Sequence, residues 1–263
     1  MTGPGEERAY LHELVERLRD VLGRKLVGIY VGGSYALEDY EPGRSDLDVA
    51  AVVASPLPAG TKADVVAAVR HEALPCPARG LELVVYTAAA AGARATRAAF
   101  ELNLNTGATM PFRADTKPVR GQLHWFAIDR SILRSRGIAL AGPPAQDVFA
   151  SPPASALRPV LADALRWYRE GGRPHDAVLN ACRSLRFADE GVWSSKAAAA
   201  RWALGTPVDV DDRELVAEAL EALSTRAELD SSRVDAFLAR AVARLTRRDA
   251  GGRPRRARRP RPR

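Results

Sequence analysis

The hydrophobic pattern of this 263-residue chain changes near residue 150. Before that point, short aliphatic and β-branched runs alternate with segments whose apolar residues recur at helical spacing, which is typical of an α/β sheet region. Ser151-Pro152-Pro153 then forms a linker, and beyond it the apolar residues keep only the helical period. We therefore expect a mixed sheet with flanking helices over residues 1–150 and an all-α helical bundle over residues 151–246.

The elements of both units are predicted from this periodicity and from Gly, Pro and Asn punctuation. Strands are predicted over Lys25–Val31, Leu47–Val53, Leu81–Tyr86 and Ile138–Leu140. Helices of the first unit are predicted over Glu6–Leu22, Tyr35–Asp39, Lys62–Leu74 and Leu123–Arg136. Helices of the second unit are predicted over Ala154–Tyr168, Asp176–Asp189, Ser195–Ala203, Arg213–Ser224 and Ser231–Thr246.

The positive charge of the chain is concentrated at its end. Residues 247–263 hold nine arginines and one aspartate, so this tail carries +8 of a net charge of +7 and leaves the other 246 residues at −1. A segment of Arg, Pro and Gly buries too little apolar surface to order itself, so we expect it to be disordered. It would either tether the protein to nucleic acid or another anionic surface, or simply reflect an Arg-, Ala- and Pro-rich coding sequence. We favour the second interpretation and expect nucleic acid as a partner only through this tail.

The remaining composition excludes several classes of protein. No apolar run reaches the length of a membrane span, and the polar, acidic start does not resemble a secretory signal, so we expect a cytoplasmic protein without membrane partners. Cys76 and Cys182 lie far apart without metal-ligand spacing, and we expect both to be reduced and buried.

Three carboxylates lie on the predicted strands in a pattern that packing does not explain. Asp46 and Asp48 are two residues apart at the start of an apolar strand, so their side chains project to the same face. Glu82 is the polar member of another apolar strand. Each could alone be a solvated strand end. Together they are costly in an apolar region unless a divalent cation lies between them, and oxygen ligands without a His or Cys group favour Mg²⁺ or Mn²⁺ over zinc.

Gly33-Ser34 supplies a second part of such a site. It ends the first predicted strand, where a backbone without a side chain, free N–H groups and a hydroxyl would suit a triphosphate. By itself this dipeptide would be read as an ordinary strand-to-helix turn. Its position before the carboxylates makes the nucleotide interpretation stronger.

In this order, Gly33-Ser34, Asp46-x-Asp48 and Glu82 resemble the signature of nucleotidyltransferases of the DNA polymerase β-like superfamily. Two further stretches narrow the resemblance, Gly142-Pro143 after a short strand and the helical segment Leu179–Leu204. With Ser45 before the aspartates, they are similar to the aminoglycoside nucleotidyltransferases that adenylylate streptomycin and spectinomycin. The likeness covers most of the chain.

The resemblance implies an enzyme that transfers a nucleoside monophosphate, AMP from ATP, to a hydroxyl of an aminoglycoside-like small molecule. Asp46 and Asp48 would bind the Mg²⁺ that carries the triphosphate, and Gly33, Ser34 and Ser45 would contact the nucleotide. Relatives place an arginine and a lysine of the helical domain on the phosphates. Arg183 and Lys196 match them in spacing, so the helical unit would close a cleft over the nucleotide and the acceptor.

The sequence allows two roles for Glu82 and several candidate residues for binding the acceptor. Glu82 would be the general base for the acceptor hydroxyl or a third metal ligand, and we favour the base. A polycationic acceptor would need further carboxylates. The candidates are Glu101, Asp163, Asp176 and Asp189.

The sequence departs from the streptomycin-modifying relatives at two places, which leaves acceptor and base recognition unassigned. It has no aromatic and acidic cluster at Glu101–Gly107, and Ala222 stands where those relatives place a tyrosine near the nucleotide. One alternative is a nucleotidyltransferase acting on a protein or tRNA acceptor. Another is a non-catalytic nucleotide-binding or nucleic-acid-binding module, which would have no reason to hold three carboxylates together.

Overall fold

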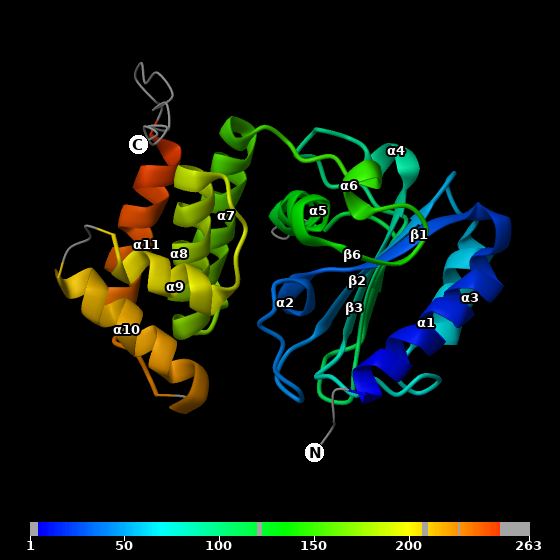
Figure 1. Ribbon diagram of the computed structural model, residues 1–263, viewed down its shortest axis with the longest axis horizontal. Helices are drawn as coiled ribbons and strands as arrows, with labels where there is room; N and C mark the ends of the chain where they lie inside the picture. Colours follow the sequence, from blue (N-terminus) through cyan, green and yellow to red (C-terminus); the bar gives the residue numbers. More distant parts are fainter. Residues whose placement is uncertain (1–4, 120–122, 207–209, 226, 248–263) are drawn as a thin grey trace, which may run out of the picture.

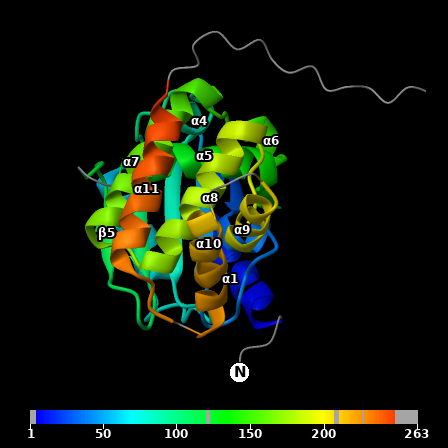
Figure 2. The same ribbon diagram turned by 90° about the vertical axis from the view of Figure 1, so that its left-hand side faces the viewer.

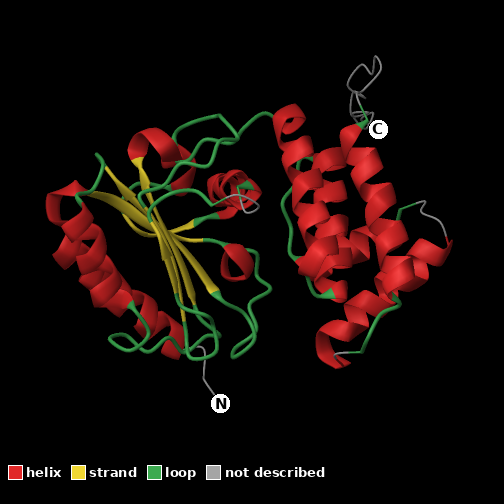
Figure 3. Ribbon diagram, turned by 180° about the vertical axis from the view of Figure 1, so that it is seen from behind, coloured by secondary structure: helices red, strands yellow, loops and turns green. Residues whose placement is uncertain are grey.

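The computed structural model describes residues 5–119, 123–206, 210–225 and 227–247. The predicted disordered tail falls almost wholly outside these residues. All strands lie in one half of the described chain, and the other half is helical (Figure 3). The fold class predicted from the hydrophobic pattern is therefore confirmed.

One mixed six-stranded sheet forms the centre of the first half. In chain order its strands are β1 Leu26–Val31, β2 Leu47–Val53, β3 Leu81–Thr87, β4 Leu102–Thr106, β5 Arg113–Asp115 and β6 Ile138–Ala141. Their order across the sheet is β5-β4-β3-β2-β1-β6. Only β2 and β3 are parallel, and the other neighbours pair antiparallel. Both central strands therefore begin at the same edge of the sheet.

Helices cover both faces of this sheet (Figure 1). Apolar side chains of α1 Glu6–Leu22 and α3 Ala59–Val69 pack on one face, against residues such as Ile29 and Val49. On the opposite face, α5 His124–Arg136 and the short α6 Ala145–Val148 pack against Tyr30, Val52 and Tyr86. The carboxylates predicted to form the site belong to this second face, because they share the parity of Val52 and Tyr86 along the strands.

The second half packs around one central helix. Its helices are α7 Ala154–Gly171, α8 Pro174–Glu190, α9 Lys196–Leu204, α10 Val210–Thr225 and α11 Ser231–Thr246. Helix α8 contacts the other four, and its buried residues include Val178, Leu179 and Cys182 (Figure 2). Ala222 of α10 is fully buried in this half. Cys76 and Cys182 are both buried and unpaired.

Two strands and two short helices were not anticipated. β4 and β5 extend the sheet beyond β3, and α4 Ala88–Ala91 and α6 are single turns. The β4 sequence Leu-Asn-Leu-Asn-Thr does alternate, and its buried residues are Leu102, Leu104 and Thr106. Asn is uncommon in strands, which hides this element from a pattern based on β-rich residues.

Two predicted helices are shifted. The helix expected over Tyr35–Asp39 is α2 Gly33–Ala36, which begins at the glycine itself. The helix expected over Lys62–Leu74 is α3, which starts after Pro58 and ends at Val69 because Arg70 takes an extended ψ of 150°. Apolar residues beyond Val69 continued the helical period, which is why the sequence pattern runs too far.

Helix α5 joins the two halves. Ala127, Ile128 and Ile132 belong to the apolar core of the helical half, whereas Phe126 and Leu133 belong to the core against the sheet. In Figure 1, α5 lies between the sheet and α7. The two halves therefore share one helix rather than meeting at two finished surfaces.

A buried hydrogen-bond chain fixes this junction. The indole N–H of Trp193, between α8 and α9, donates to Ser131 Oγ of α5 over 2.8 Å. Ser131 Oγ also lies 2.9 Å from Ser151 Oγ in the linker. Trp193 and Ser131 are each only 3% exposed, so water cannot replace these contacts without opening the interface.

Replacing Ser131 by alanine should therefore destabilise the protein. The change leaves the Trp193 N–H buried without its acceptor, which typically costs about 1–3 kcal/mol. Ser135→Ala on the same helix is the control, because Ser135 is exposed and its change should stay within about 0.5 kcal/mol. Urea unfolding followed by tryptophan fluorescence measures both, and equal stability of the two variants would contradict a contribution from this hydrogen bond.

Candidate active site

Two of the predicted site carboxylates are direct neighbours across the sheet. Parallel pairing of β2 and β3 puts Asp48 opposite Glu82, and antiparallel pairing of β3 and β4 puts Glu82 opposite Asn105. The Asn105 amide lies 3.5 Å from Glu82 Oε1. Asp46, directly before β2, lies close enough to Asp48 for its charge to raise the pKa of the Asp48 carboxyl. The start of β2 and β3 therefore gathers the three carboxylates at one edge.

Asp46 forms an ion pair with an arginine side chain in this structure. Arg79, just before β3, forms a two-pronged ion pair with it, with Nε donating to Asp46 Oδ1 over 2.5 Å and the Nη2 group donating to the other oxygen. The two loops are also joined by the Arg79 N–H, which donates to Ser45 O. Arg79 was not predicted as a site residue. Its position just before the strand that carries Glu82 was the sequence signal that could have identified it.

The Gly32-Gly33 turn approaches Asp48 closely. The Gly32 N–H donates to Asp48 O over 2.8 Å, and Gly33 has a φ of +52°. A Cβ on Gly33 would lie only 1.6 Å from Asp48 Oδ2. This position therefore needs glycine both for its backbone conformation and to leave room for the carboxylate.

The two predicted serines lie near this turn in different settings. Ser34 is half-buried within the single turn of α2. Ser45 Oγ accepts a hydrogen bond from the Glu41 N–H over 3.0 Å, which closes the loop before Asp46. In this structure Ser45 thus supports the loop, and its contact with a nucleotide stays a prediction.

The carboxylates open into a pocket between the sheet and α5. Its volume is about 400 Å³, and it is open to solvent. Asp48 and Glu82 line it together with Asp129 of α5, which was not among the predicted site residues. Asp129 follows Ile128 directly on a helix predicted to be apolar on one face. A lone acid beside such a face was the signal that could have identified it.

Burial and mutual repulsion raise the pKa of all three pocket carboxyls. Burial is the main cause in each case, and the neighbouring carboxylates add to it. The pKa of Asp48 rises to about 6, that of Asp129 to about 7 and that of Glu82 to about 8. These three carboxyls therefore lack enough neighbouring positive charge to keep them fully ionised near neutral pH.

Cations of the helical half face this pocket. Arg183 and Lys196 both lower the pKa of Asp48, although less than burial and Asp46 raise it. Lys196 Nζ lies 2.6 Å from Asp176 Oδ1, which anchors the lysine at the start of α9. The structure therefore brings both predicted cations toward the carboxylates of the other half. Their contact with phosphate stays a prediction.

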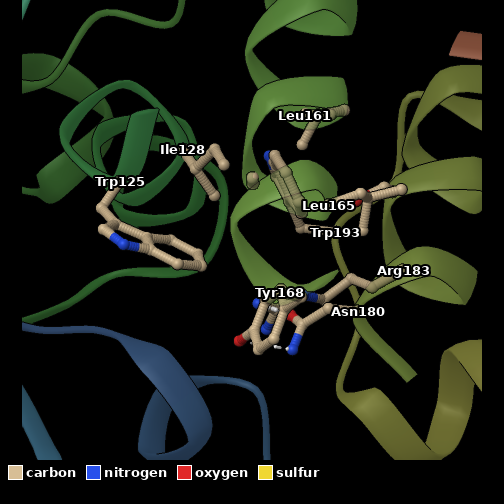
Figure 4. A pocket seen from close by; sticks show the side chains of 10 residues that line it. Trp125, Ile128, Leu161, Leu165, Tyr168, Asn180, Arg183 and Trp193 are labelled. Atoms are coloured by element: carbon tan, nitrogen blue, oxygen red, sulfur yellow. Dashed lines mark hydrogen bonds between the residues drawn. The ribbon is translucent and has the colours of Figure 1, made fainter. Parts of the chain in front are cut away.

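Arg183 is oriented by a chain of polar contacts at a second, smaller pocket (Figure 4). Its Nη2 group donates to Asn180 Oδ1 over 2.6 Å, and Asn180 Nδ2 donates to the Tyr168 hydroxyl over 2.9 Å. Trp125 and Ile128 of α5 form the opposite wall. This pocket lies along the junction of the two halves.

The four candidate acceptor carboxylates do not form a group. Glu101 pairs with Lys62 over 2.8 Å and accepts from the Leu57 N–H, at the opposite end of the sheet from Glu82. Asp163 and Asp189 pair with nearby arginines of the helical half. Only Asp176 lies beside a predicted site residue, Lys196.

The donor chemistry of the site fits a hard divalent cation. Asp46, Asp48 and Glu82 offer carboxylate oxygens, which suit Mg²⁺, and burial raises the pKa of the Asp48 and Glu82 carboxyls. Within the part of the chain that the structure describes, no three His, Cys, Asp or Glu side chains converge into a ready-made metal site. Metal binding by Asp46 would therefore compete with its Arg79 ion pair.

Two family models of known proteins match this chain, one in each of its two halves. A family model for the nucleotidyltransferase domain matches residues 11–87, and one for the aminoglycoside adenylyltransferase C-terminal domain matches residues 148–248. The chain resembles the crystal structure of spectinomycin adenyltransferase AAD(9) from Enterococcus faecialis with ATP and spectinomycin, with a TM-score of 0.69. The identity is 16%, over 91% of this chain and 99% of that chain. A comparison with curated proteins finds no match.

The raised pKa values predict how the stability of the metal-free protein depends on pH. A carboxyl whose pKa is near 4 when unfolded and about 7 when folded, such as Asp129, stabilises the fold fully below pH 4. That contribution is lost as the pH rises through 7. The stability gain of Asp129→Asn over wild type should therefore be larger at pH 8.5 than at pH 5, by on the order of 2–3 kcal/mol.

Thermal unfolding in the presence of EDTA at the two pH values measures this difference. Asp163→Asn is the control, because Asp163 is exposed and pairs with Arg166 at the surface of the helical half. A stability gain of Asp129→Asn that is the same at pH 5 and pH 8.5 would show that the charge of Asp129 is not its cause.

Proposed function

Since this chain is an aminoglycoside adenylyltransferase-like nucleotidyltransferase, we propose that it transfers AMP from ATP to a hydroxyl of an aminoglycoside-type antibiotic and releases pyrophosphate. One observation carries the proposal: carboxylates at one edge of the sheet face cations from the helical half. Binding a triphosphate requires carboxylates that hold the metal and cations that face the phosphates, and a site between the two halves supplies these groups together.

Asp46 and Asp48 would hold Mg²⁺ in this proposal. When bound, the ion neutralises phosphate charge and stabilises the in-line displacement at the α-phosphate. The backbone of Gly33 leaves the space in front of Asp48 free, and Ser34 offers a hydroxyl to the phosphates. These roles rest on the donor chemistry and on the turn geometry.

Glu82 is the proposed general base. It lies next to Asp48 in register but is not tied to any cation by an ion pair in the described residues, in contrast to Asp46. Its pKa is raised to about 8 in the metal-free protein, so its carboxylate is a stronger base than that of an ordinary glutamate, and positive charge from bound Mg²⁺ would favour the ionised form that accepts a proton. The proton of the acceptor hydroxyl would pass to its carboxylate as the oxygen attacks phosphorus. A third metal ligand is the alternative role.

Arg183 and Lys196 would stabilise the triphosphate and the departing pyrophosphate. Both are held ready by neighbours, Arg183 by Asn180 and Lys196 by Asp176. Prearranged donors of this kind lose little conformational entropy when the ligand binds. The acceptor would lie between the halves, where Tyr168 and Glu82 are close enough to influence one another.

The decisive assay measures pyrophosphate release with each of the four ribonucleoside triphosphates and a panel of aminoglycosides. We expect release only with Mg²⁺, ATP and an aminoglycoside that carries a suitable hydroxyl. Release with a protein or tRNA acceptor instead would move the proposal to that class. Binding of ATP without any transfer would favour a non-catalytic module.

Substituting Asn for either Asp46 or Asp48 should abolish transfer, but the two substitutions should differ in their effect on protein stability. Asp48→Asn removes a carboxylate with a pKa of about 6, so the metal-free variant should be at least as stable as wild type at pH 8. Asp46→Asn breaks the Arg79 ion pair and should be less stable, by about 1–2 kcal/mol. Each should lower Mg²⁺-dependent turnover by about 100-fold or more. Near-normal turnover in both would refute this metal site.

Arg183→Ala and Lys196→Ala should each weaken Mg²⁺–ATP binding roughly 10- to 100-fold, because each loses a charge-assisted phosphate contact of about 1.5–3 kcal/mol. Arg186→Ala is the matched control, since its guanidinium pairs with Glu190 on the same helix, and it should bind normally. Calorimetric titration measures all three. Wild-type affinity in both test variants would remove the helical half from the nucleotide site.

A further inference from the structure

The pocket between the sheet and α5 extends past the carboxylates of the proposed reaction. Beyond Asp48 and Glu82 it is lined by Asp129 and Tyr86, and its remaining side walls are apolar. The apolar lining residues are Val49, Ala50, Val84, Ile132 and Leu133. This part of the pocket thus combines a carboxylate and a phenol with a surface that repels water.

Tyr86 presents an unsatisfied polar group to this pocket. Its side chain is 0% exposed, and its hydroxyl has no hydrogen-bond partner among the described residues. Leaving such a group unpaired costs about 1–3 kcal/mol, and a buried polar group of this kind indicates a missing water or ligand. Tyr86 also lines the pocket directly, so a bound molecule could reach it.

Asp129 supplies the charge of the same pocket. Its carboxylate forms no hydrogen bond or ion pair with any residue that the structure describes. Arg183 and Arg130 lower the pKa of Asp129, but less than burial and Asp48 raise it. The Arg130 guanidinium donates to Ala90 O and Ala95 O rather than to the Asp129 carboxylate. After burial, the charge of Asp129 is the next cause that raises the pKa of Tyr86, so the two groups lie close together.

These features select the chemistry of the occupant. Beyond the proposed Mg²⁺ and phosphate positions at Asp46 and Asp48, an anion would be repelled by Asp129, and a neutral group would leave the Asp129 carboxylate unpaired. A divalent metal ion would need more oxygen ligands than one carboxylate and one phenol provide. An ammonium group offers several N–H donors and one charge, and its alkyl part suits the apolar walls.

We propose that Asp129 and Tyr86 bind an ammonium group of the acceptor and thereby select acceptors that carry an amine near the reacting hydroxyl. The Asp129 carboxylate takes the charged hydrogen bond, and the Tyr86 oxygen accepts a second one. This inference rests on the proposed function, because it places the amine beside the proposed base Glu82. It makes α5 a determinant of acceptor choice.

A binding test needs no turnover. Methylammonium chloride at 100 mM, compared with equal KCl at pH 8, should raise the melting temperature of the wild-type protein by on the order of 1–3 °C. Asp129→Asn should lose this response, and Tyr86→Phe should lose part of it. Asp163→Asn, which changes an exposed carboxylate, should respond as wild type does.

Tyr86→Phe also distinguishes a role of the Tyr86 hydroxyl in binding the ammonium group from a role in stabilising the fold. Removing an unpaired buried hydroxyl should leave the free protein at least as stable as wild type, whereas a structural role would make it less stable. The expected combination is therefore undiminished stability with a weaker response to methylammonium. An equal response in wild type, Asp129→Asn and Tyr86→Phe would overturn the proposal.

A kinetic test uses an aminoglycoside acceptor and its N-acetylated derivative, with ATP. For the free amine, Asp129→Asn should raise the acceptor KM about 10- to 100-fold, the range of one charged hydrogen bond, and leave the KM for ATP unchanged. For the N-acetylated acceptor it should change KM little. A rise in the KM for ATP instead would place Asp129 on the metal side and overturn the inference. If no acceptor is modified by wild type, the proposed function fails, and the methylammonium response alone decides the inference.

Discussion

Repulsion among carboxylates at the start of β2 and β3 is the constraint around which the rest of the structure is arranged. Pairing of the strands forces Asp48 against Glu82, and α5 adds Asp129 above them. Arg79 offsets one negative charge, at Asp46, and Arg183 and Lys196 partly offset another from across the junction. The metal-free protein thus stores unfavourable charge that a cationic ligand would relieve.

Much of this arrangement could be predicted from the sequence. Strand periodicity is enough to place Asp46 and Asp48 on one face, and the strong apolar runs of β2 and β3 locate both strands to within a residue. The change of period after Ser151-Pro152-Pro153 distinguishes the helical half. These features are local, and local patterns are what a single sequence expresses most directly.

The remainder depends on contacts between distant segments. Asn105 meets Glu82 only because β4 pairs with β3, and the polar composition of β4 conceals that strand. Asp129 becomes a pocket residue only when α5 lies on the sheet, and Arg79 becomes the partner of Asp46 only when the two loops meet. The orientation of a side chain across a junction has no periodic signal, so single-sequence reasoning could not supply these neighbours.

The shared helix α5 has a consequence for modularity. Its two apolar faces belong to different cores, with Phe126 and Leu133 toward the sheet and Ile128 and Ile132 toward α7. A chain divided at the linker would leave the second face of α5 uncovered on one fragment and an unfilled core on the other. Recombination that exchanges the helical half between such proteins must therefore carry matching changes on α5. A crossover at the prolines leaves Ile128 and Ile132 against a foreign core, and one before His124 also removes β6 from its pairing with β1.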